Sequence, residues 1–485
     1  MRRRRWIGAA DRALMARVAR TDSVVLDQIL PTVGRSANYS RLWFGVAGGL
    51  ALTRTRRGRR AALRGVAALG LASATVNVVG KQLAGRARPA IDLVPLVRRL
   101  TVAPRTLSFP SGHSASAAAF ATGVALENPW LGIPVGVLAA AVAGSRIAVG
   151  AHYPSDVVAG VGIGVAAGLL TQTWWPRSPL DPAAAKVGEA PALATGAGLV
   201  LVTNAASGNG SDAGLAELTG QLPDAELVRV GSDDDIAGEF DKAAARCTVL
   251  GVAGGDGTVN AAAGVAARRG LPLLVVPGGS LNHFARDIGV ESVADAVAAV
   301  RAGTAVRVDL GLAGDHVFVN TASIGLYVDL VRFRERWEHR LGKWPAMAAG
   351  LVHVLRHAEP CAVEVDGRQR RLWMLFAGNC RYRPAGFAPT VRTRLDDGRL
   401  EVRIVDAGVR FARTRIVLGT LTRTLRWSGA YQATQRSGVE IAGQSGPLGL
   451  SVDGEVTAGP TVVRLGKAFG ALTIYRPAGS ADRSG

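Results

Sequence analysis

The chain has 485 residues, which is long enough for two or three domains. Its formal net charge is +20, and hydrophobic residues make up 48% of it although aromatic residues make up only 5%. Such a basic chain binds either nucleic acid or an anionic membrane surface. Long apolar runs favour the membrane, and without a zinc-finger spacing or an RNA-binding aromatic motif we expect no nucleic acid partner.

The cysteines exclude a disulfide-based fold. Cys247, Cys361 and Cys380 are far apart and form no C-x-x-C pair, so they predict neither a disulfide framework nor a zinc site. All three lie in the second half of the chain. We therefore expect that half to lie in a reducing compartment, with the cysteines as small core residues.

The amino-terminal segment 1–34 begins with four arginines, like the first part of a signal peptide. Asp11 and Arg12 interrupt the apolar stretch that should follow, so cleavage is not expected. Residues 6–32 alternate apolar and charged positions at helical spacing. This pattern predicts an amphipathic helix, which either lies on the membrane or caps a soluble surface.

Apolar runs then predict an all-α transmembrane helix bundle over residues 35–176. The runs are 42–53, 61–80, 114–127, 131–149 and 157–175. A full crossing needs ~20 residues, so 42–53 is a doubtful span and 114–127 is short. Arg64 lies near the end of its run, where its side chain can extend to the membrane surface.

Basic and histidine residues gather at the ends of these runs. Lys81 and Arg88-Pro89 come first, then Pro110-Ser111-Gly112-His113, and then Ser145-Arg146 followed by His152 and Asp156. Uncompensated charge is costly inside a bilayer, so this clustering suggests function. Cations can hold a phosphate while one histidine attacks phosphorus and another protonates the leaving oxygen.

Together the three segments resemble the signatures of the type 2 phosphatidic acid phosphatase (PAP2) superfamily. This resemblance implies that His152 is the nucleophile that forms a phosphohistidine, that Asp156 orients it and that His113 is the general acid. It also implies that the substrate phosphate is held by a set of five residues: Lys81, Arg88, Ser111, Gly112 and Arg146. It implies no metal or other cofactor for this half.

The run 157–175 determines the expected topology. His152 and Asp156 precede it, and everything after Trp174-Trp175 follows it. If this run crosses the membrane, the phosphatase site and the carboxy-terminal half lie on opposite faces. The basic loop 54–60 then lies on the carboxy-terminal side, as the positive-inside rule prefers.

The second half has a different pattern. Residues 177–197 are rich in proline and alanine and predict an extended linker. Strand, turn and helix alternate over 198–305, which predicts an α/β nucleotide-binding subdomain. Short alternating strands over 306–476 predict an antiparallel β-sandwich, and 477–485 form a tail.

The turn Gly254-Gly255-Asp256-Gly257-Thr258 allows backbone N–H groups to approach a phosphate before a helix begins. With N-A-A-S-G-N-G from Asn204, P-G-G-S-L-N-H-F-A-R around Ser280, and V-D-G-E, it resembles the diacylglycerol kinase catalytic family. The resemblance implies ATP, Mg²⁺ and a lipid alcohol. It implies that Glu455 is the base, that Asp256 serves catalysis, and that Asp397 matches a structural magnesium position. The residues implied to line the ATP phosphates are Asn204, Ser207, Gly208, Gly254, Gly255, Asp256, Gly257, Thr258 and Ser280.

Two departures weaken the resemblance slightly: Ala205 stands where proline is usual, and Ser280 where threonine is commoner. Residues 327–358 hold arginines and two tryptophans before an apolar helix, which suggests either a membrane-docking face or a solvated charged helix. The main hypothesis is a bifunctional membrane enzyme whose multi-pass phosphatase site is extracytoplasmic and whose kinase half is cytoplasmic. Alternatives are a phosphatase with a lipid-sensing kinase-like module, or a kinase for a sphingoid or polyprenol acceptor. The oligomeric state stays open.

Overall fold

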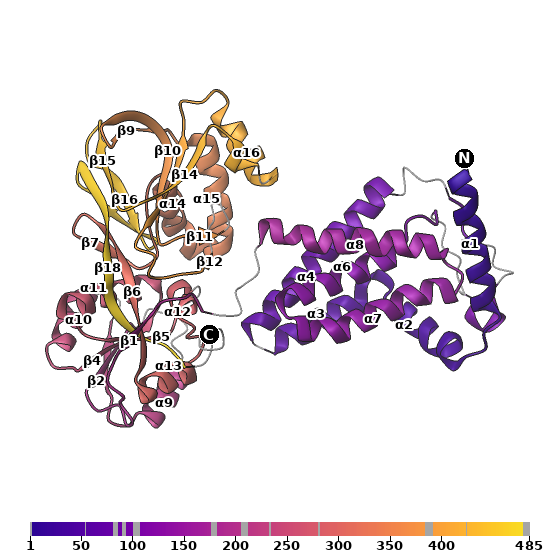
Figure 1. Ribbon diagram of the computed structural model, residues 1–485, viewed down its shortest axis with the longest axis horizontal. Coiled ribbons are helices and arrows are strands. Elements are labelled where there is room, and N and C mark those ends of the chain that lie inside the picture. The colour runs from indigo at the N-terminus through magenta and orange to yellow at the C-terminus, as the bar shows by residue number, and fades with distance from the viewer. Residues whose placement is uncertain are drawn as a thin grey trace. The chain divides into compact units, whose positions relative to one another are not determined.

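The computed structural model divides the chain into two compact units, Met1–Ser178 and Pro179–Gly485 (Figure 1). The described residues are 2–53, 55–80, 86–89, 94–99, 107–175, 182–204, 212–231, 234–279, 282–383, 391–422 and 424–478. Each unit has its own hydrophobic cores, so each is described by itself.

The first unit is helical, as the sequence predicts. Its elements are α1 (Arg2–Ala19), η1 (Val25–Ile29), α2 (Leu30–Ser36), η2 (Asn38–Ser40), α3 (Arg41–Leu52), α4 (Arg56–Ala74), η3 (Thr75–Gly80), η5 (Leu96–Arg98), α6 (Gly112–Glu127), α7 (Pro129–Ala148) and α8 (Pro154–Trp174). Among the described residues, three stretches are long and apolar enough to cross a membrane, namely Arg57–Val78, Pro129–Ala148 and Pro154–Trp174. The short helix α3 is not among these three, in agreement with the doubt over run 42–53.

Small residues let α8 approach α6 closely. Gly160, Gly164 and Gly168 recur every four residues along α8, so they share one face of the helix. A Cβ at Gly160 would meet the Ser111 carbonyl oxygen, and one at Gly164 would meet that of Ala115. This spacing of small residues is typical of helix pairs in membranes, and it fixes α8 beside α6 along most of their length.

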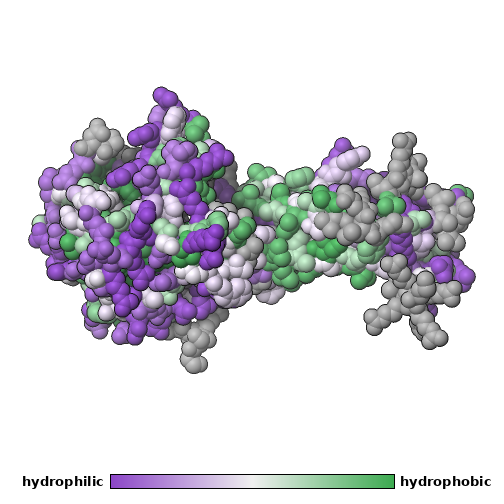
Figure 2. Space-filling model, turned by 90° about the horizontal axis from the view of Figure 1, so that it is seen from above, coloured by the Kyte–Doolittle hydropathy of each residue, from purple (hydrophilic) through white to green (hydrophobic). Residues whose placement is uncertain are grey.

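Figure 2 shows a hydrophobic surface on the middle of the helical unit, whereas the visible face of the second unit is largely hydrophilic. Large apolar side chains on the candidate spans are exposed, among them Leu63, Ile133, Val137, Val158 and Leu169. Exposed apolar surface of this extent is unfavourable in water and favourable against lipid tails.

A buried ion cluster lies at the carboxyl ends of α6 and α8. Arg64 of α4 is fully buried and donates to the Glu127 carboxylate at 2.6 Å and to Thr171 Oγ1 at 3.0 Å. Arg60 donates to the same carboxylate at 2.8 Å. Glu127 thus neutralises Arg64 at this end of the bundle, where Arg64 also donates to the Trp175 carbonyl oxygen and lies over the Trp175 ring.

The second unit begins with an α/β part that has the expected strand–helix alternation. Its elements are β1 (Lys186–Glu189), β2 (Leu199–Asn204), α9 (Asp212–Gln221), β3 (Glu226–Val230), α10 (Ile236–Ala244), β4 (Val249–Gly254), α11 (Asp256–Arg269), β5 (Leu273–Pro277), α12 (His283–Asp287) and α13 (Val293–Ala302). The four strands β3, β2, β4 and β5 are parallel neighbours in that order. Parallel strands place their carboxyl ends, and the turns that follow, at one edge of the sheet.

The β-rich part follows, also as expected. Its strands are β6 (Thr304–Ala313), β7 (His316–Phe318), β8 (Thr321–Gly325), β9 (Cys361–Val365), β10 (Arg368–Asn379), β11 (Tyr382–Arg383), β12 (Val391–Arg392), β13 (Leu400–Asp406), β14 (Tyr431–Arg436), β15 (Val439–Gly443), β16 (Gly449–Val452), β17 (Glu455–Ala458) and β18 (Val462–Tyr475). Its helices are α14 (Leu326–Leu341), α15 (Lys343–His357), α16 (Ala412–Thr422) and η6 (Leu425–Trp427).

Strand β18 joins the two parts of the second unit. Val463 and Leu465 belong to the core of the β-rich part, whereas Leu472 and Ile474 belong to the core of the α/β part. The strand pairs antiparallel with β15 and β6 and parallel with β5. The boundary expected at residue 305 therefore crosses a continuous hydrogen-bonded sheet.

The expected linker 177–197 is shorter than its composition suggests. Lys186–Glu189 form β1, which pairs antiparallel with β6. Ala183 N donates to the Asp287 carbonyl at 2.8 Å, and Leu193 N donates to the Val300 carbonyl at 2.9 Å. Residues 183–193 thus pack as an edge of the second unit, and composition missed this because an edge strand needs few apolar residues.

Candidate active sites

Helix ends bring together the second and third motif segments of the first unit, which carry His113 and His152. Gly112 is the first residue of α6, Arg146 lies in the last turn of α7, and Asp156 lies in the first turn of α8. Ser111 N donates to the Asp156 carbonyl oxygen at 3.0 Å, which joins the two segments directly. This juncture follows from the glycine face that holds α8 against α6.

His152 is buried and has one defined tautomer. Its Nδ1 lies 2.6 Å from the Ser108 carbonyl oxygen, which can only accept, so Nδ1 carries the proton. Nε2 therefore has the lone pair, and it lies 3.4 Å from a guanidinium nitrogen of Arg88. Burial, together with the positive charge of Arg88, lowers the pKa of His152 to about 3. At neutral pH the imidazole is uncharged and Nε2 is nucleophilic.

Asp156 does not hold His152 in the way that its spacing suggests. Its Oδ2 lies 3.9 Å from His152 Nδ1, which is too far for a hydrogen bond. The same oxygen accepts from Tyr153 N at 2.9 Å and from the hydroxyl of Ser108. The prediction that Asp156 orients His152 directly is therefore wrong. The Ser108 carbonyl oxygen lies next to Nδ1 instead, so Asp156 contacts His152 only indirectly, through Ser108.

The implied phosphate-binding residues Arg88 and Arg146 and the implied general acid His113 lie at the same end of the bundle. Arg88 donates to the Ala151 carbonyl at 2.6 Å, and buried Arg146 donates to Ser145 Oγ at 3.1 Å. His113 Nε2 lies 3.0 Å from Asn38 Oδ1. The charges of Arg88, His113 and Arg146 each lower the pKa of His152, which indicates that they are close to it. Lys81 lies outside the described residues.

Two charged residues of this site have no role in the resemblance: Asp11 lies before the motifs, and Arg86 lies between Lys81 and Arg88 inside the first one. Asp11 of α1 is buried and accepts from Ser155 N at 2.9 Å and from Arg86 at 2.6 Å. Arg86 also donates to Asp156 Oδ1 at 2.7 Å. Figure 1 shows α1 running crosswise past the ends of α7 and α8. Residues 6–32 do not form the one amphipathic helix expected, because α1 ends at Ala19 and η1 begins at Val25, and α1 packs against this end of the bundle.

The glycine turn of the second unit forms as expected between β4 and α11. Gly278 N donates to the Gly254 carbonyl at 3.1 Å, which places the turn after β5 against the turn after β4. A Cβ at Gly279 would lie 2.6 Å from the α-carbon of Gly255. Only glycine fits at position 279, and α11 begins at Asp256 with its free N–H groups at this edge.

Glu455 lies at this turn although the two are 198 residues apart in sequence. Its carboxylate contacts the position that a Cβ of Gly257 would occupy. Desolvation of that carboxylate raises the pKa of Glu455, and so does the nearby charge of Glu335. A raised pKa brings a carboxylate closer to the value that suits a general base.

Asp453 is a functional candidate that the motif reading missed. It accepts from three successive backbone N–H groups, those of Val319, Asn320 and Thr321, at 2.7–2.8 Å. Burial raises its pKa to about 7. Its φ of 48° fits the tight turn between β16 and β17, and so Asp453 fixes the hairpin that presents Glu455.

Only some of the remaining residues expected to bind ATP are among the described residues. Asn204 ends β2, next to β4. Thr258 lies in the first turn of α11, and Asp256 Oδ1 accepts from Phe284 N at 3.2 Å. Ser207, Gly208 and Ser280 lie outside the described residues. The turn and the helix amino terminus together fit a nucleotide phosphate, because both offer N–H donors to an anion.

Known proteins resemble both units. Residues 61–179 match the PAP2 superfamily, and residues 198–313 match the diacylglycerol kinase catalytic domain. Decaprenylphosphoryl-5-phosphoribose phosphatase of Mycobacterium tuberculosis is 37% identical over 27% of this chain and 70% of its own. A "Probable lipid kinase YegS-like" of Pseudomonas aeruginosa is 30% identical over 49% of this chain and 79% of its own. A transmembrane PAP2-type phosphatidylglycerolphosphate phosphatase from Bacillus subtilis aligns with a TM-score of 0.28 and 25% identity, over 35% of this chain and 85% of that one.

The fold and the two sites thus define a membrane protein that joins a lipid phosphate phosphatase domain to a lipid kinase domain. The chain belongs to the PAP2 superfamily through its first unit and to the diacylglycerol kinase catalytic family through its second. Both family resemblances seen in the sequence are confirmed.

Proposed function

We propose that the protein is a bifunctional membrane enzyme. The helical unit removes phosphate from a lipid phosphate, and the second unit transfers phosphate from ATP to a lipid alcohol. The observation that best supports the first activity is the neutral His152, whose Nε2 faces the guanidinium of Arg88. The one that best supports the second is the contact of Glu455 with Gly257 of the phosphate-binding turn.

In the phosphatase step, His152 Nε2 attacks phosphorus and forms a phosphohistidine while the bond to the lipid oxygen breaks. His113 gives that oxygen its proton, and then takes a proton from the water that hydrolyses the phosphohistidine. Arg88 and Arg146, with Lys81, neutralise the phosphate oxygens as charge develops. Asp156 supports His152 through Ser108.

In the kinase step, the turn from Gly254 to Thr258 and the amino terminus of α11 hold the nucleotide phosphates. Glu455 takes the proton from the lipid hydroxyl as that oxygen attacks the terminal phosphorus. Mg²⁺ bound with ATP supplies charge neutralisation. A cavity of about 430 Å³ lies beside α14 and is lined by apolar residues such as Val328 and Leu448 and by charged ones such as Asp329 and Arg332, so it offers a mixed surface to a lipid acceptor.

The two activities act on opposite membrane faces in this proposal. Helix α8 has 21 residues, and a rise of 1.5 Å per residue makes it about 30 Å long, the thickness of a bilayer core. His152 precedes it, and the second unit follows it. Because ATP is cytoplasmic, the kinase unit is on the cytoplasmic side and the phosphatase site is extracytoplasmic. Separation of this kind prevents the two activities from reversing each other.

The test uses the purified full-length protein in detergent, with labelled ATP and a panel of lipid alcohols: diacylglycerol, a sphingoid base and a polyprenol. His152→Ala keeps the phosphatase from erasing the product, and Glu455→Gln is the matched kinase control. Label on one lipid that disappears in Glu455→Gln supports the kinase. Label on no lipid, with phosphate release intact in the wild type, leaves a phosphatase with a lipid-sensing unit.

The phosphatase is tested in parallel with lipid phosphates. Phosphatidate, phosphatidylglycerol phosphate and a polyprenyl-linked sugar phosphate all present a phosphomonoester to the cations, and the name of the mycobacterial relative makes the last the first choice. Acid-quenched protein from a short incubation with substrate labelled in its phosphate carries that label on His152 if a phosphohistidine forms. Phosphate release by His152→Ala at the wild-type rate contradicts the mechanism.

A further inference from the structure

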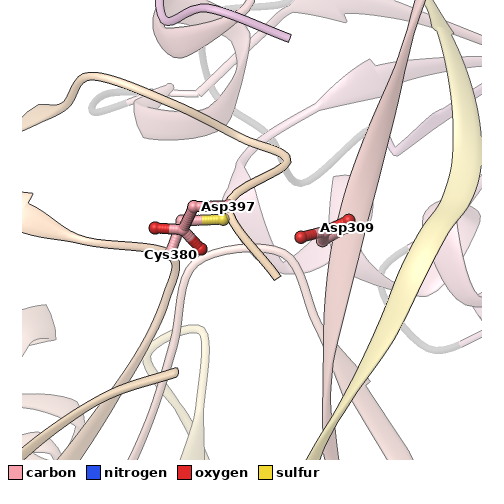
Figure 3. Close-up of side chains that lie close together, drawn as sticks. All are labelled: Asp309, Cys380 and Asp397. Atoms are coloured by element: carbon pink, nitrogen blue, oxygen red, sulfur yellow. The ribbon is translucent and has the colours of Figure 1, made fainter. Parts of the chain in front are cut away.

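A cluster of metal-binding residue types lies in the β-rich part of the second unit. Asp309 of β6, Cys380 after β10 and Asp397 before β13 place one ligand atom each within 4.8 Å of one another. Figure 3 shows Asp309 on its strand facing Cys380 and Asp397. Asp397 is the residue for which the family resemblance implies a structural Mg²⁺.

Lys467 of β18 fills this cluster with its own positive charge. Its side chain is fully buried, and Nζ donates to Asn379 Oδ1 at 2.7 Å, to Cys380 Sγ at 3.0 Å and to the Arg399 carbonyl at 3.1 Å. These three bonds use all three protons of the ammonium group. Nζ also lies 3.5 Å from Asp309 Oδ2 and 3.8 Å from Asp397 Oδ1.

The residues present do not fit Mg²⁺ at this position. Mg²⁺ requires about six oxygen ligands at ~2.1 Å, and the ammonium group occupies the space between the two carboxylates. Cys380 is a poor ligand for this ion, because Mg²⁺ prefers oxygen to sulfur. A second cation here would also meet the repulsion of Lys467.

The two carboxylates are also tied to the backbone. Asp309 accepts from Gly398 N at 2.9 Å and from Gly470 N at 2.8 Å. Asp397 accepts from Arg381 N and Arg399 N, each at 2.9 Å. The cluster therefore joins β6, the end of β10, the loop before β13 and β18, which is the work that a structural metal would do.

We propose that the Lys467 ammonium replaces the structural metal in this protein, and that Asp397 holds this internal cation. The Mg²⁺ of the kinase unit is then only the ion that comes with ATP. This inference does not depend on whether the kinase is active, since it concerns how the β-rich part is held together.

The test compares the wild type, Lys467→Ala, and Lys467→Ala combined with Asp397→Asn, all as full-length protein in detergent after EDTA treatment and desalting. The readouts are bound Mn²⁺, measured by electron paramagnetic resonance, and the Tm of the second unit with and without millimolar Mg²⁺, in the absence of nucleotide. The wild type binds no Mn²⁺ at the cluster, and Mg²⁺ leaves its Tm unchanged. Lys467→Ala melts lower and regains several degrees with Mg²⁺, and the double variant loses this gain.

A wild type that retains one equivalent of Mn²⁺, and loses it in Asp397→Asn, overturns the proposal. This measurement stands even if Lys467→Ala does not fold. Lys467→Met, which keeps most of the volume without the charge, separates loss of the cation from loss of packing: a Mg²⁺-responsive Tm is expected in the alanine variant alone.

A second observation carries an independent inference about the phosphatase unit. Helix α1 lies before the region that matches the PAP2 superfamily, yet it brings buried Asp11 to Arg86 and Ser155. Arg86 in turn bonds to Asp156, and Asp156 bonds to Ser108, whose carbonyl holds His152. We infer that Asp11 is a positioning residue for the phosphatase site, an inference that rests on the proposed function of His152.

Asp11→Asn tests this role, with the exposed Asp22→Asn as the matched control and Met15→Ala as a variant that loosens the docking of α1 without removing the carboxylate. In Asp11→Asn the kcat of phosphate release falls roughly 10-fold or more while KM changes little, as for other residues that orient a reacting group. Asp22→Asn keeps the wild-type kcat, and Met15→Ala keeps most of it.

The outcomes separate the two claims. If His152→Ala is inactive and Asp11→Asn has the wild-type kcat, Asp11 is not a positioning residue and the proposed mechanism survives. If His152→Ala retains activity, the proposed mechanism itself fails. If Asp11→Asn and Met15→Ala lose activity equally, with equal changes in KM, the role of Asp11 is only to dock α1.

Discussion

At the scale of the residue, the phosphatase site depends on keeping one imidazole uncharged next to fixed cations. Burial and Arg88 lower the pKa of His152 from 6.5 to about 3. The imidazole that we propose as the nucleophile is thus uncharged at any physiological pH without a base to deprotonate it. The cations that we propose to bind phosphate also lower its pKa.

This lowered pKa predicts the pH dependence of phosphate release. We expect kcat/KM not to fall through His152 as the pH decreases from about 7 to about 5, because the imidazole stays neutral. An acid limb near pH 6.5 assigned to His152 by NMR titration would contradict this. Between pH 6.5 and about 3, His152 binds a proton in the unfolded chain but not in the folded protein. The stability that depends on the neutral imidazole is therefore complete above pH 6.5 and is lost as the pH falls toward about 3.

In the second unit, Gly257 is expected to be indispensable. A methyl group there would meet the Glu455 carboxylate, so Gly257→Ala should move the base and lower the kinase kcat by roughly 10- to 100-fold. Gly220→Ala, in α9 of the same unit, is the control for a glycine change in a helix, because a Cβ there meets open space. Phosphate release by the first unit should be the same in all three proteins, and an unchanged kinase rate in Gly257→Ala would show that Glu455 does not act at this turn.

At the scale of the element, α8 works through one glycine-lined face. Gly164→Val should force α8 away from α6 and separate Asp156 from Ser111, because overpacking of this kind costs about 1–3 kcal/mol and displaces the helix. Gly162 lies on the same helix with open space around it, so Gly162→Val is the matched control. Phosphate release should be lost in the first variant and kept in the second. Equal activity in both would mean that the packing does not position the site.

The ion cluster at the other end of the bundle gives a stability prediction. Glu127→Gln leaves two arginines, one of them fully buried, without their anion. Breaking a buried pair in this way costs about 3–5 kcal/mol, so the first unit should unfold at a clearly lower temperature in detergent. Glu189→Gln, an exposed change in β1, should leave that temperature unaltered. Unfolding of the Glu127→Gln protein at the wild-type temperature would indicate that water already solvates the cluster.

The sequence predicted what depends on short-range pattern. The apolar runs around Val137 and Val165 predicted α7 and α8, and the alternation after Val306 predicted the β-rich part. The sequence did not predict contacts between residues that are far apart along the chain. Arg86 is 70 residues from Asp156, and Asp11 is 144 residues from Ser155, so no local spacing marks either pair.

The sequence also did not predict the cases in which another residue takes the place of an expected contact partner. Asp156 has the right spacing to meet His152, but the Ser108 carbonyl occupies that side of the ring. Asp397 has the right motif for a metal, but Lys467, 70 residues later in the sequence, supplies the charge. Spacing predicts which residues can meet, whereas packing decides which of them do.

At the scale of the whole molecule, the order of the segments makes one prediction about topology. A GFP fusion at residue 190 should fluoresce and an alkaline phosphatase fusion there should be inactive, because this position follows α8 on the proposed cytoplasmic side. Between α7 and α8, at Gly150, the reporters should give the opposite result. Residues 56–60, expected as part of a basic loop, form the first turns of α4 instead. Their arginines at this end of the helix agree with the orientation, because positive charge near a membrane favours the cytoplasmic side. Equal reporter activity at both positions would exclude a crossing by α8.

Strand β18 has a consequence for biosynthesis. It completes both cores of the second unit, and its partner β5 was made about 200 residues earlier. The ribosome therefore synthesises most of the kinase unit before it synthesises β18, the central strand of that unit. Helix α8 is by then already available for membrane insertion. Until β18 is made, the nascent sheet lies beside the bilayer with unpaired strand edges. We therefore expect that synthesis of the two domains as one polypeptide requires chaperones and yields truncation products.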